Sequence, residues 1–315
     1  MAKSKNKKYG ANVTQKEHYV SQFYLEEFDK ESEPLKQVSL KEDPDDKTKP
    51  KIINQASADS ICYKRFFYET PWLPEQQEKF GEFVALNDLE HFFGSLETKY
   101  RPLRDKINKL CLNPNNKHAL ICTKEDKELL ADFVANFYLR NPSVVNSPEF
   151  QDISDIRENP ICVAIQELFN WLEFGSIEPM LIEGNKRAWL RNDMENSGHN
   201  CFKQQLLNKH VTFLVSEKGL FVTSNIPVVV DSSEEDCVFF VLSPHVAVLY
   251  TYKWPSNRAV FLEEKHVMIF NSLYTMNKPE MVTLYGTERN LIKTLKHINY
   301  QFKIADNKNK KIIST

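Results

Sequence analysis

Glycine is scarce in this chain of 315 residues, which contains only 8. The chain therefore has no Gly-rich loop of the kind that cradles phosphates, and neither the GxGxxG nor the GxxxxGK(S/T) pattern occurs. The HExxH and GxSxG patterns of zinc proteases and serine hydrolases are absent as well. No arginine is followed after four to six residues by a histidine, a spacing used by many small helical ribonucleases. The commonest nucleotide-binding and hydrolase motifs are thus excluded.

Long apolar runs and paired cysteines are also missing. No uninterrupted apolar run approaches the roughly 20 residues of a membrane-spanning helix, and the Lys-rich N-terminus contains no signal peptide pattern. Because no CxxC occurs, we expect neither a zinc knuckle nor a disulfide framework. We expect a cytoplasmic protein, outside the membrane, with reduced thiols at Cys62, Cys111, Cys122, Cys162, Cys201 and Cys237.

Charge of one sign is not in excess, since the formal net charge is −2. The chain as a whole therefore has no field that would attract nucleic acid. Lysines do cluster in "KSKNKK" and "KNKKII", which either contact phosphates or form solvated ends. We predict basic flexible tails at 1–15 and 305–315, on either side of a single domain over 16–304.

Apolar residues recur at three- and four-residue steps from about 74 to 208, which predicts a helical part. The clearest helix is "TKEDKELLADFVANFYLRNP", where Thr123 and Asp126 resemble a capping box and Pro142 ends the helix. "NPICVAIQELFNWLEF" is predicted as another helix, with proline in its first turn and Gly175 just past its end.

β-Branched and aromatic residues dominate about 209–255 and predict four or five short, mostly antiparallel strands. Nearer the start, "PLKQVSLKEDPDDKTKPKII" predicts two short strands around a polar turn. Two helices are predicted to close the chain over about 258–304. The predicted class is α+β: a helical N-terminal and middle part packed on a mostly antiparallel sheet from the later part, closed by C-terminal helices.

Polar side chains in three apolar stretches raise the question of function. His18 and Gln22 stand in "EHYVSQFYLEEF", Arg140 ends the clearest helix, and Ser224 and Asn225 lie in "TSNIP" between two strands. The residues alone favour structural roles. His18 would be a core histidine and Arg140 a cation on the last helical carbonyls, while "TSNIP" would be a turn bonded to its own backbone.

A restriction-type nuclease would need a carboxylate pair and a lysine to hold Mg²⁺ beside the phosphate. "AVFLEEKH" supplies Glu263 and Lys265, with Asp231 as a distant acidic candidate. A Glu-x-Lys pattern is common by chance on helices, so it is weak evidence. We therefore expect no protein metal site and no cofactor, with Mg²⁺ possible if the chain is a nuclease.

Five stretches, taken in order, resemble the bacterial domain-of-unknown-function family 4238 over most of the chain. They are "HYVSQFYLEEF", "CYKRFFYE", "YLRNP", "LFVTSNIPVVV" and "VFFVLSPHVAVLY". The resemblance carries over His18, Gln22, Arg140 and Ser224. Asn225 stands where the family pattern usually has aspartate, and an amide is neither a base nor a strong metal ligand at neutral pH. The resemblance implies a bacterial gene of the kind placed among candidate phage-defence genes.

Two hypotheses follow from these residues together. In the first, the chain is a toxin-type defence effector that cleaves nucleic acid or nucleotides. His18 would act as acid or base, Arg140 would clamp the phosphate, and Gln22, Ser224 and Asn225 would bind the substrate. In the second, the chain is a non-catalytic module that senses a phage protein or binds another partner, and the polar residues are buried tethers. The sequence leaves homo-oligomer formation and nucleic-acid binding through the lysine tails open.

Overall fold

The computed structural model describes residues 14–314 except 31, 42–49, 117–118, 194, 196, 232–235, 255–256, 277–280, 301 and 306–311. Most of the two predicted basic tails, 1–15 and 305–315, lies outside the described residues. The chain forms two compact units, each assembled from three separate stretches. Unit 1 comprises Met1–Tyr19, Tyr63–Thr98 and Leu139–Cys201, and unit 2 comprises Val20–Cys62, Lys99–Tyr138 and Phe202–Thr315.

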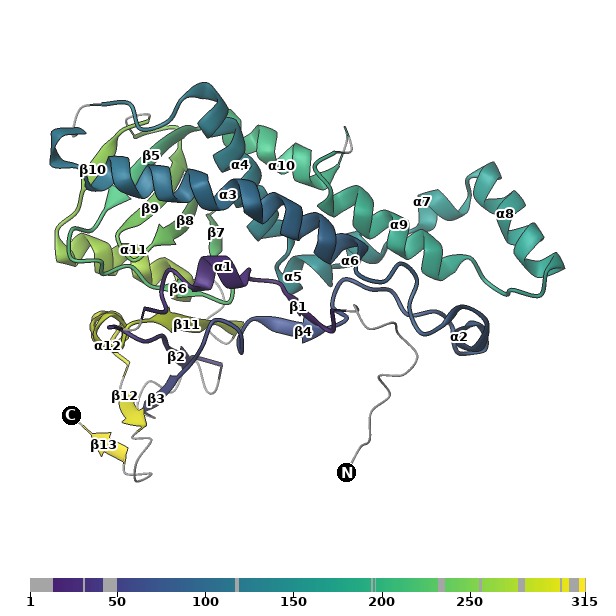
Figure 1. Cartoon of the computed structure of the whole chain (residues 1–315), viewed down its shortest axis with the longest axis horizontal. Coiled ribbons are helices and arrows are strands. Elements are labelled where there is room, and N and C mark those ends of the chain that lie inside the picture. The colour runs from purple at the N-terminus through teal and green to yellow at the C-terminus, as the bar shows by residue number, and fades with distance from the viewer. Residues whose placement is uncertain are drawn as a thin grey trace. The chain divides into compact units, whose positions relative to one another are not determined.

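Unit 1 combines a two-stranded sheet with helices. β1 (Lys16–His18) pairs antiparallel with β4 (Tyr63–Arg65), with His18 opposite Tyr63 (Figure 1). The helical elements are α2 (Pro74–Phe80), the start of α3 (Asp88–Leu112), α5 (Pro142–Val145), α6 (Pro148–Gln151), α7 (Ser154–Arg157), α8 (Pro160–Trp171), α9 (Glu178–Leu190) and the start of α10 (Gly198–Leu207). Proline in the first turn begins α2, α5, α6, α8 and α9, where its missing N–H costs no helical hydrogen bond.

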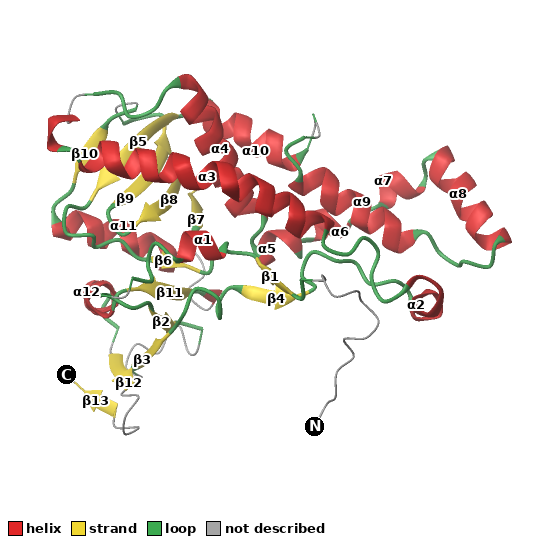
Figure 2. Ribbon diagram, in the orientation of Figure 1, coloured by secondary structure: helices red, strands yellow, loops and turns green. Residues whose placement is uncertain are grey.

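Unit 2 contains two sheets. The first has the order β10-β5-β9-β8-β7, and β5, β8 and β9 lie side by side in Figure 2. Its strands are β5 (His210–Val215), β7 (Val228–Asp231), β8 (Cys237–Ser243), β9 (Val246–Thr251) and β10 (Ala259–Phe261). The second has the order β13-β12-β3-β2-β11-β6. Its strands are β2 (Lys36–Ser39), β3 (Lys51–Gln55), β6 (Thr223–Ser224), β11 (Thr283–Gly286), β12 (Phe302–Ala305) and β13 (Ile312–Ser314).

The helices of unit 2 pack around an aromatic core. They are α1 (Gln22–Leu25), the rest of α3, the 3-10 turn Pro114–Asn116, α4 (Lys124–Leu139, whose last residue belongs to unit 1), the rest of α10, α11 (Glu264–Met276) and α12 (Glu288–His297). Tyr24 of α1 stacks on Phe240 of β8, with ring centroids 5.3 Å apart. The Tyr24 hydroxyl is buried, bonds Thr223 Oγ1 at 2.7 Å and donates to the carbonyl of Val241 at 2.7 Å. We call residues 17–28 the opening segment; its part from Val20 onward therefore contributes to the core of this unit.

The predicted α+β class is confirmed. All described elements from Pro74 to Leu207 are helical, and the two strands predicted near the start pair as β2 and β3. The finer arrangement differs from the prediction in two respects. Residues 16–65 carry four short strands instead of a helical N-terminal part, and the later strands divide between two sheets. Strands β10, β11 and β12 also interrupt the region of the closing helices, since local patterns do not reveal distant strand partners.

Candidate functional site

The five predicted site residues are distributed over the two units. His18 and Arg140 belong to unit 1, and Gln22, Ser224 and Asn225 belong to unit 2. Gln22 is the first residue of α1 and its side chain is exposed, so it is not a buried tether. Convergence of all five residues on one pocket stays a prediction.

Arg140 is the centre of a buried polar cluster in unit 1, and the structure does bring it together with His18. Its side chain is 1% exposed. Nε donates to the Tyr68 hydroxyl at 2.9 Å, Nη1 contacts a carboxylate oxygen of Glu97 at 2.9 Å, and Nη2 donates to the main-chain carbonyl of His18. The Tyr68 hydroxyl donates to the same carbonyl at 3.2 Å. We call these four residues the Arg140 cluster.

Arg140 was predicted to satisfy the last carbonyls of its own helix. Its described hydrogen bonds go instead to β1, to Glu97 of α3 and to Tyr68, which follows β4. The guanidinium also lies over the Phe93 ring, 4.2 Å from its centroid. Arg140 thus holds the main chain of the opening segment, and the His18 ring is left to pack 5.7 Å from the Tyr63 ring.

Three buried carboxyl groups, from β1, α9 and the segment that follows β4, lie beside the Arg140 cluster. Glu17 Oε2 accepts from the N–H of Tyr68 at 2.8 Å, and Glu183 Oε2 accepts from the N–H of Thr70 at 3.1 Å. Between these two positions, Glu69 accepts from the N–H of Asn87. The three carboxyl groups are at most 4% exposed, and we call Glu17, Glu69 and Glu183 the carboxyl cluster.

Burial controls the charge state of the carboxyl cluster. It raises the pKa of Glu17 and Glu183, and it raises the pKa of Glu69 to about 8 with help from the Glu17 and Glu183 carboxylates. The interaction between the two carboxyl groups raises the pKa of Glu69 and works against the rise in the pKa of Glu17, so Glu69 is the member of the pair that holds a proton near neutral pH. Burial lowers the pKa of Lys186, whose ammonium donates to the Tyr68 carbonyl at 3.3 Å.

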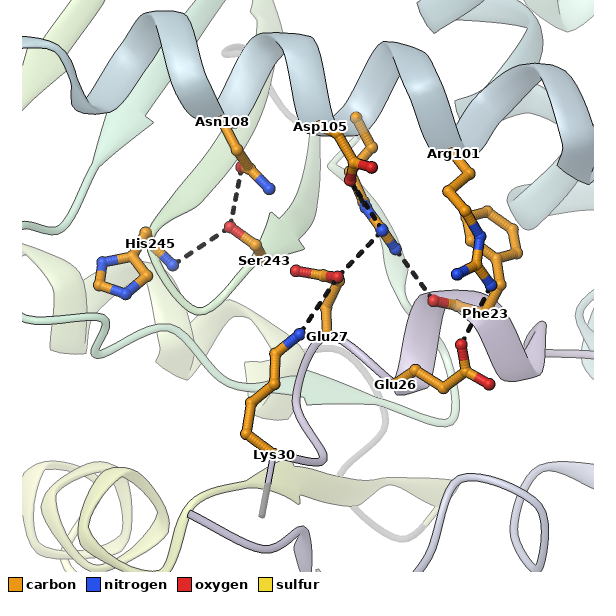
Figure 3. A network of polar contacts seen from close by, with 10 residues as sticks. Phe23, Glu26, Glu27, Lys30, Arg101, Asp105, Asn108, Ser243 and His245 are labelled. Carbon is orange, nitrogen blue, oxygen red and sulfur yellow. Dashed lines mark hydrogen bonds and ion pairs between the residues drawn. The ribbon is translucent and has the colours of Figure 1, made fainter. Parts of the chain in front are cut away.

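A second buried arginine holds the opening segment in unit 2. Arg104 of α3 is 3% exposed; its Nη1 donates to the Phe23 carbonyl at 2.9 Å, and its Nη2 lies 2.9 Å from a Glu27 carboxylate oxygen. Figure 3 shows the exposed pair Arg101–Glu26 nearby, 3.0 Å apart. In the same view Ser243 donates to Asn108 at 2.9 Å. Two arginines on separate units therefore bind carbonyls at the two ends of one short segment.

The "TSNIP" stretch forms the predicted turn. Ser224 Oγ donates to the Ile226 carbonyl at 2.7 Å and accepts from the Ile226 N–H at 3.0 Å. Asn225 uses both ends of its amide, since Oδ1 accepts from the N–H of Thr283 at 2.7 Å and Nδ2 donates to the Met281 carbonyl at 3.0 Å. Asn225 therefore extends the pairing of β6 and β11 with its side chain.

Replacing Asn225 by aspartate, the residue usual in the family pattern, should lower the free energy of unfolding by about 1 kcal/mol. The carboxylate still accepts from the Thr283 N–H, but it places an acceptor against the Met281 carbonyl. Urea denaturation measures the change. Asn225→Ser is measured as a second variant. Equal stability of wild type and Asn225→Asp would contradict the role given to Nδ2.

The weak nuclease pattern near α11 is an exposed ion pair. The Lys265 ammonium lies 3.0 Å from the Glu263 carboxylate, and both side chains are about 70% exposed. Asp231 ends β7. Among the described residues no group of three or more His, Cys, Asp and Glu side chains has the geometry to hold a metal ion. No helix in this described part of the chain is long and apolar enough to span a membrane.

Sequence reasoning missed the residues that complete the buried clusters, although two of them stood in a quoted motif. "CYKRFFYE" ends in Tyr68 and Glu69, and Glu17 directly precedes His18. An acidic residue directly beside an aromatic or histidine residue, as in Tyr68-Glu69 and Glu17-His18, was the available signal. Arg104 had no such signal, because its partners lie 77 or more residues away in sequence, apart from the neighbouring Asp105.

Fold and site together define an α+β protein whose opening segment is fixed by buried arginines. The chain belongs to the family described as protein of unknown function (DUF4238), whose model matches residues 16–282. No curated protein and no solved structure matches the chain. The family assignment predicted from the five stretches is thereby confirmed.

Proposed function

We propose that this protein is a non-catalytic protein-interaction module of a bacterial phage-defence system, with its polar clusters serving as structural anchors. The observation that carries the proposal is the coordination of Arg140. Each of its three nitrogen atoms donates to a group of the protein itself, and only 1% of the residue is exposed. An arginine that binds a phosphate needs an open site and N–H groups that are not already hydrogen-bonded to the protein. An arginine that only holds protein segments together needs neither.

The placement of His18 supports the same role. Its carbonyl oxygen, not its ring, receives Arg140 and Tyr68. Ser224 and Asn225 likewise bond the main chain of neighbouring segments. Four of the five predicted site residues are therefore accounted for by contacts that hold main chain in place.

A second candidate function, hydrolysis of a phosphodiester or nucleotide, is favoured by one observation. Glu17 and Glu69 form a buried pair of interacting carboxyl groups in which the pKa of Glu69 is raised to about 8. A protonated carboxylic acid beside a second carboxylate is suited to general acid–base catalysis near neutral pH. Both groups are buried, so such a reaction requires the carboxyl cluster to open toward substrate.

Induced expression followed by analysis of cellular RNA and DNA tests the proposal. Wild type, His18→Ala and Glu69→Gln are compared, and circular dichroism verifies that each variant is folded. We expect intact nucleic acid in all three cultures. Degradation by the wild type that a folded Glu69→Gln variant abolishes would overturn the interaction role and establish the carboxyl pair as catalytic.

A further inference from the structure

Helix α8 exposes more apolar surface than a solvated helix normally does. Trp171 is 79% exposed, Ile161 69% and Leu168 50%. Further exposed apolar side chains on the helix or at its C-cap are Val163, Ile165 and Leu172. Glu167 is the only charged residue within Pro160–Trp171. A helix of this composition is expected to be covered by another apolar surface.

The exposed residues follow the spacing of a helix–helix seam. Ile161, Ile165, Leu168 and Leu172 are separated by four, three and four residues. At about 100° per residue these four side chains fall within about 60° of one another, as a and d positions of a heptad do. Ala164 and Trp171 flank this stripe on one side, and we call the stripe the α8 seam.

The polar side of α8 faces its own unit. The Gln166 amide donates to the Gly175 carbonyl at 2.9 Å and accepts from the Ile177 N–H at 3.0 Å. Phe169 packs against Phe174, with ring centroids 5.7 Å apart. These contacts lie between α8 and the segment that leads to α9 (Figure 2). These contacts fix the orientation of α8, with Gln166 turned toward its own unit and the apolar stripe turned toward solvent.

We propose that the α8 seam is a self-association surface, occupied by α8 of a second copy of this chain. The positions that flank a heptad seam are Cys162, Ala164, Phe169 and Trp171, so no charge opposes the pairing of two identical stripes. This inference deepens the proposed interaction role and rests on it.

The area of the patch approaches that of a dimer interface. The exposed fractions of the four seam residues and Trp171 correspond to on the order of 600 Å² of apolar surface per chain, at the top of the about 300–600 Å² range for the largest patch of a typical monomer and below the about 800 Å² per partner of a stable interface. A membrane surface is a poorer occupant. An interfacial helix carries Lys or Arg on its polar face, and α8 carries neither.

Sedimentation velocity and light scattering over a range of micromolar concentrations test the inference. The wild type should have twice the monomer mass of 36.8 kDa. Ile165→Glu and Leu168→Glu place like charges at the centre of the seam, and each should weaken dimerisation by at least about 100-fold. Val163→Glu is the matched control, because this exposed residue of the same helix lies about 170° from the stripe. It should remain dimeric.

The outcomes separate the seam from the proposed function. Circular dichroism verifies that each variant is folded. If a charged variant unfolds, the milder Leu168→Ala variant takes its place and should have an average mass between those of monomer and dimer. A wild type that is monomeric throughout, a dimer that survives Ile165→Glu, or binding to lipid vesicles in place of dimerisation would overturn the inference. None of these results alters nucleic-acid integrity in induced cells, and degradation of nucleic acid would overturn the interaction role without changing the mass.

Discussion

Replacing Arg140 by alanine is expected to lower the free energy of unfolding by about 3 to 5 kcal/mol. The substitution removes the only described cation that contacts Glu97, and it takes a charged donor from the Tyr68 hydroxyl and the His18 carbonyl. Tyr68 is fully buried, so water does not readily replace the lost partner. Urea denaturation followed by circular dichroism measures the change.

Arg101→Ala is the matched control for this prediction. Arg101 also forms an ion pair, at 3.0 Å with Glu26, but both side chains are about half exposed. Exposed pairs contribute about 0 to 1 kcal/mol, so this variant should unfold close to wild type. If Arg140→Ala proved as stable as Arg101→Ala, the Arg140 cluster would not be an anchor.

Raising the pH from 6 to 8 is expected to lower the free energy of unfolding by at least about 2 kcal/mol. Glu69 has a pKa of about 8 in the folded state and 4.5 in its unperturbed state. Between these values the folded state binds more protons than the unfolded state, so stability falls as the pH rises. Burial raises the pKa of Glu17, Glu90 and Glu183 as well, which adds to the effect in the same direction.

Glu69→Gln isolates the contribution of this one carboxyl group. The glutamine amide reproduces the donor toward Glu17 and the acceptor toward the Asn87 N–H without releasing a proton. The variant should therefore lose stability less steeply than wild type over this pH range. Glu263→Gln, at an exposed carboxylate, should keep the wild-type slope. Parallel pH profiles for wild type and Glu69→Gln would contradict a protonated Glu69.

The amino-acid sequence alone predicted those elements of the structure that depend on local residue patterns. Helical spacing, the cap at Thr123 and the prolines predicted most helices of the middle part. The cap is present, since Asp126 accepts from the Thr123 N–H at 2.9 Å and its own N–H donates to Thr123 Oγ1. The turn at Ser224 was predictable for the same reason, since its hydrogen bonds close over two residues.

The remaining structure depends on partners that are distant in sequence. β11 pairs with β2 and β6, and no local feature of "TLYG" indicates either partner. Arg140 illustrates the same limit for the site. The first hypothesis grouped it with His18, which is 122 residues away, but the sequence did not reveal that Arg140 binds the carbonyl of His18. The carboxyl cluster arises because β1 and β4 bring Glu17 next to the segment that carries Glu69.

The central claim is that the main chain at position 18, not the imidazole ring, is what the Arg140 cluster holds. Unfolding of His18→Ala beside Arg140→Ala tests this claim most directly, because alanine removes the ring and keeps the carbonyl that Arg140 binds. We predict that His18→Ala costs about 1 kcal/mol, the amount typical of a half-buried side chain, and far less than Arg140→Ala. A loss as large as that of Arg140→Ala would contradict the account.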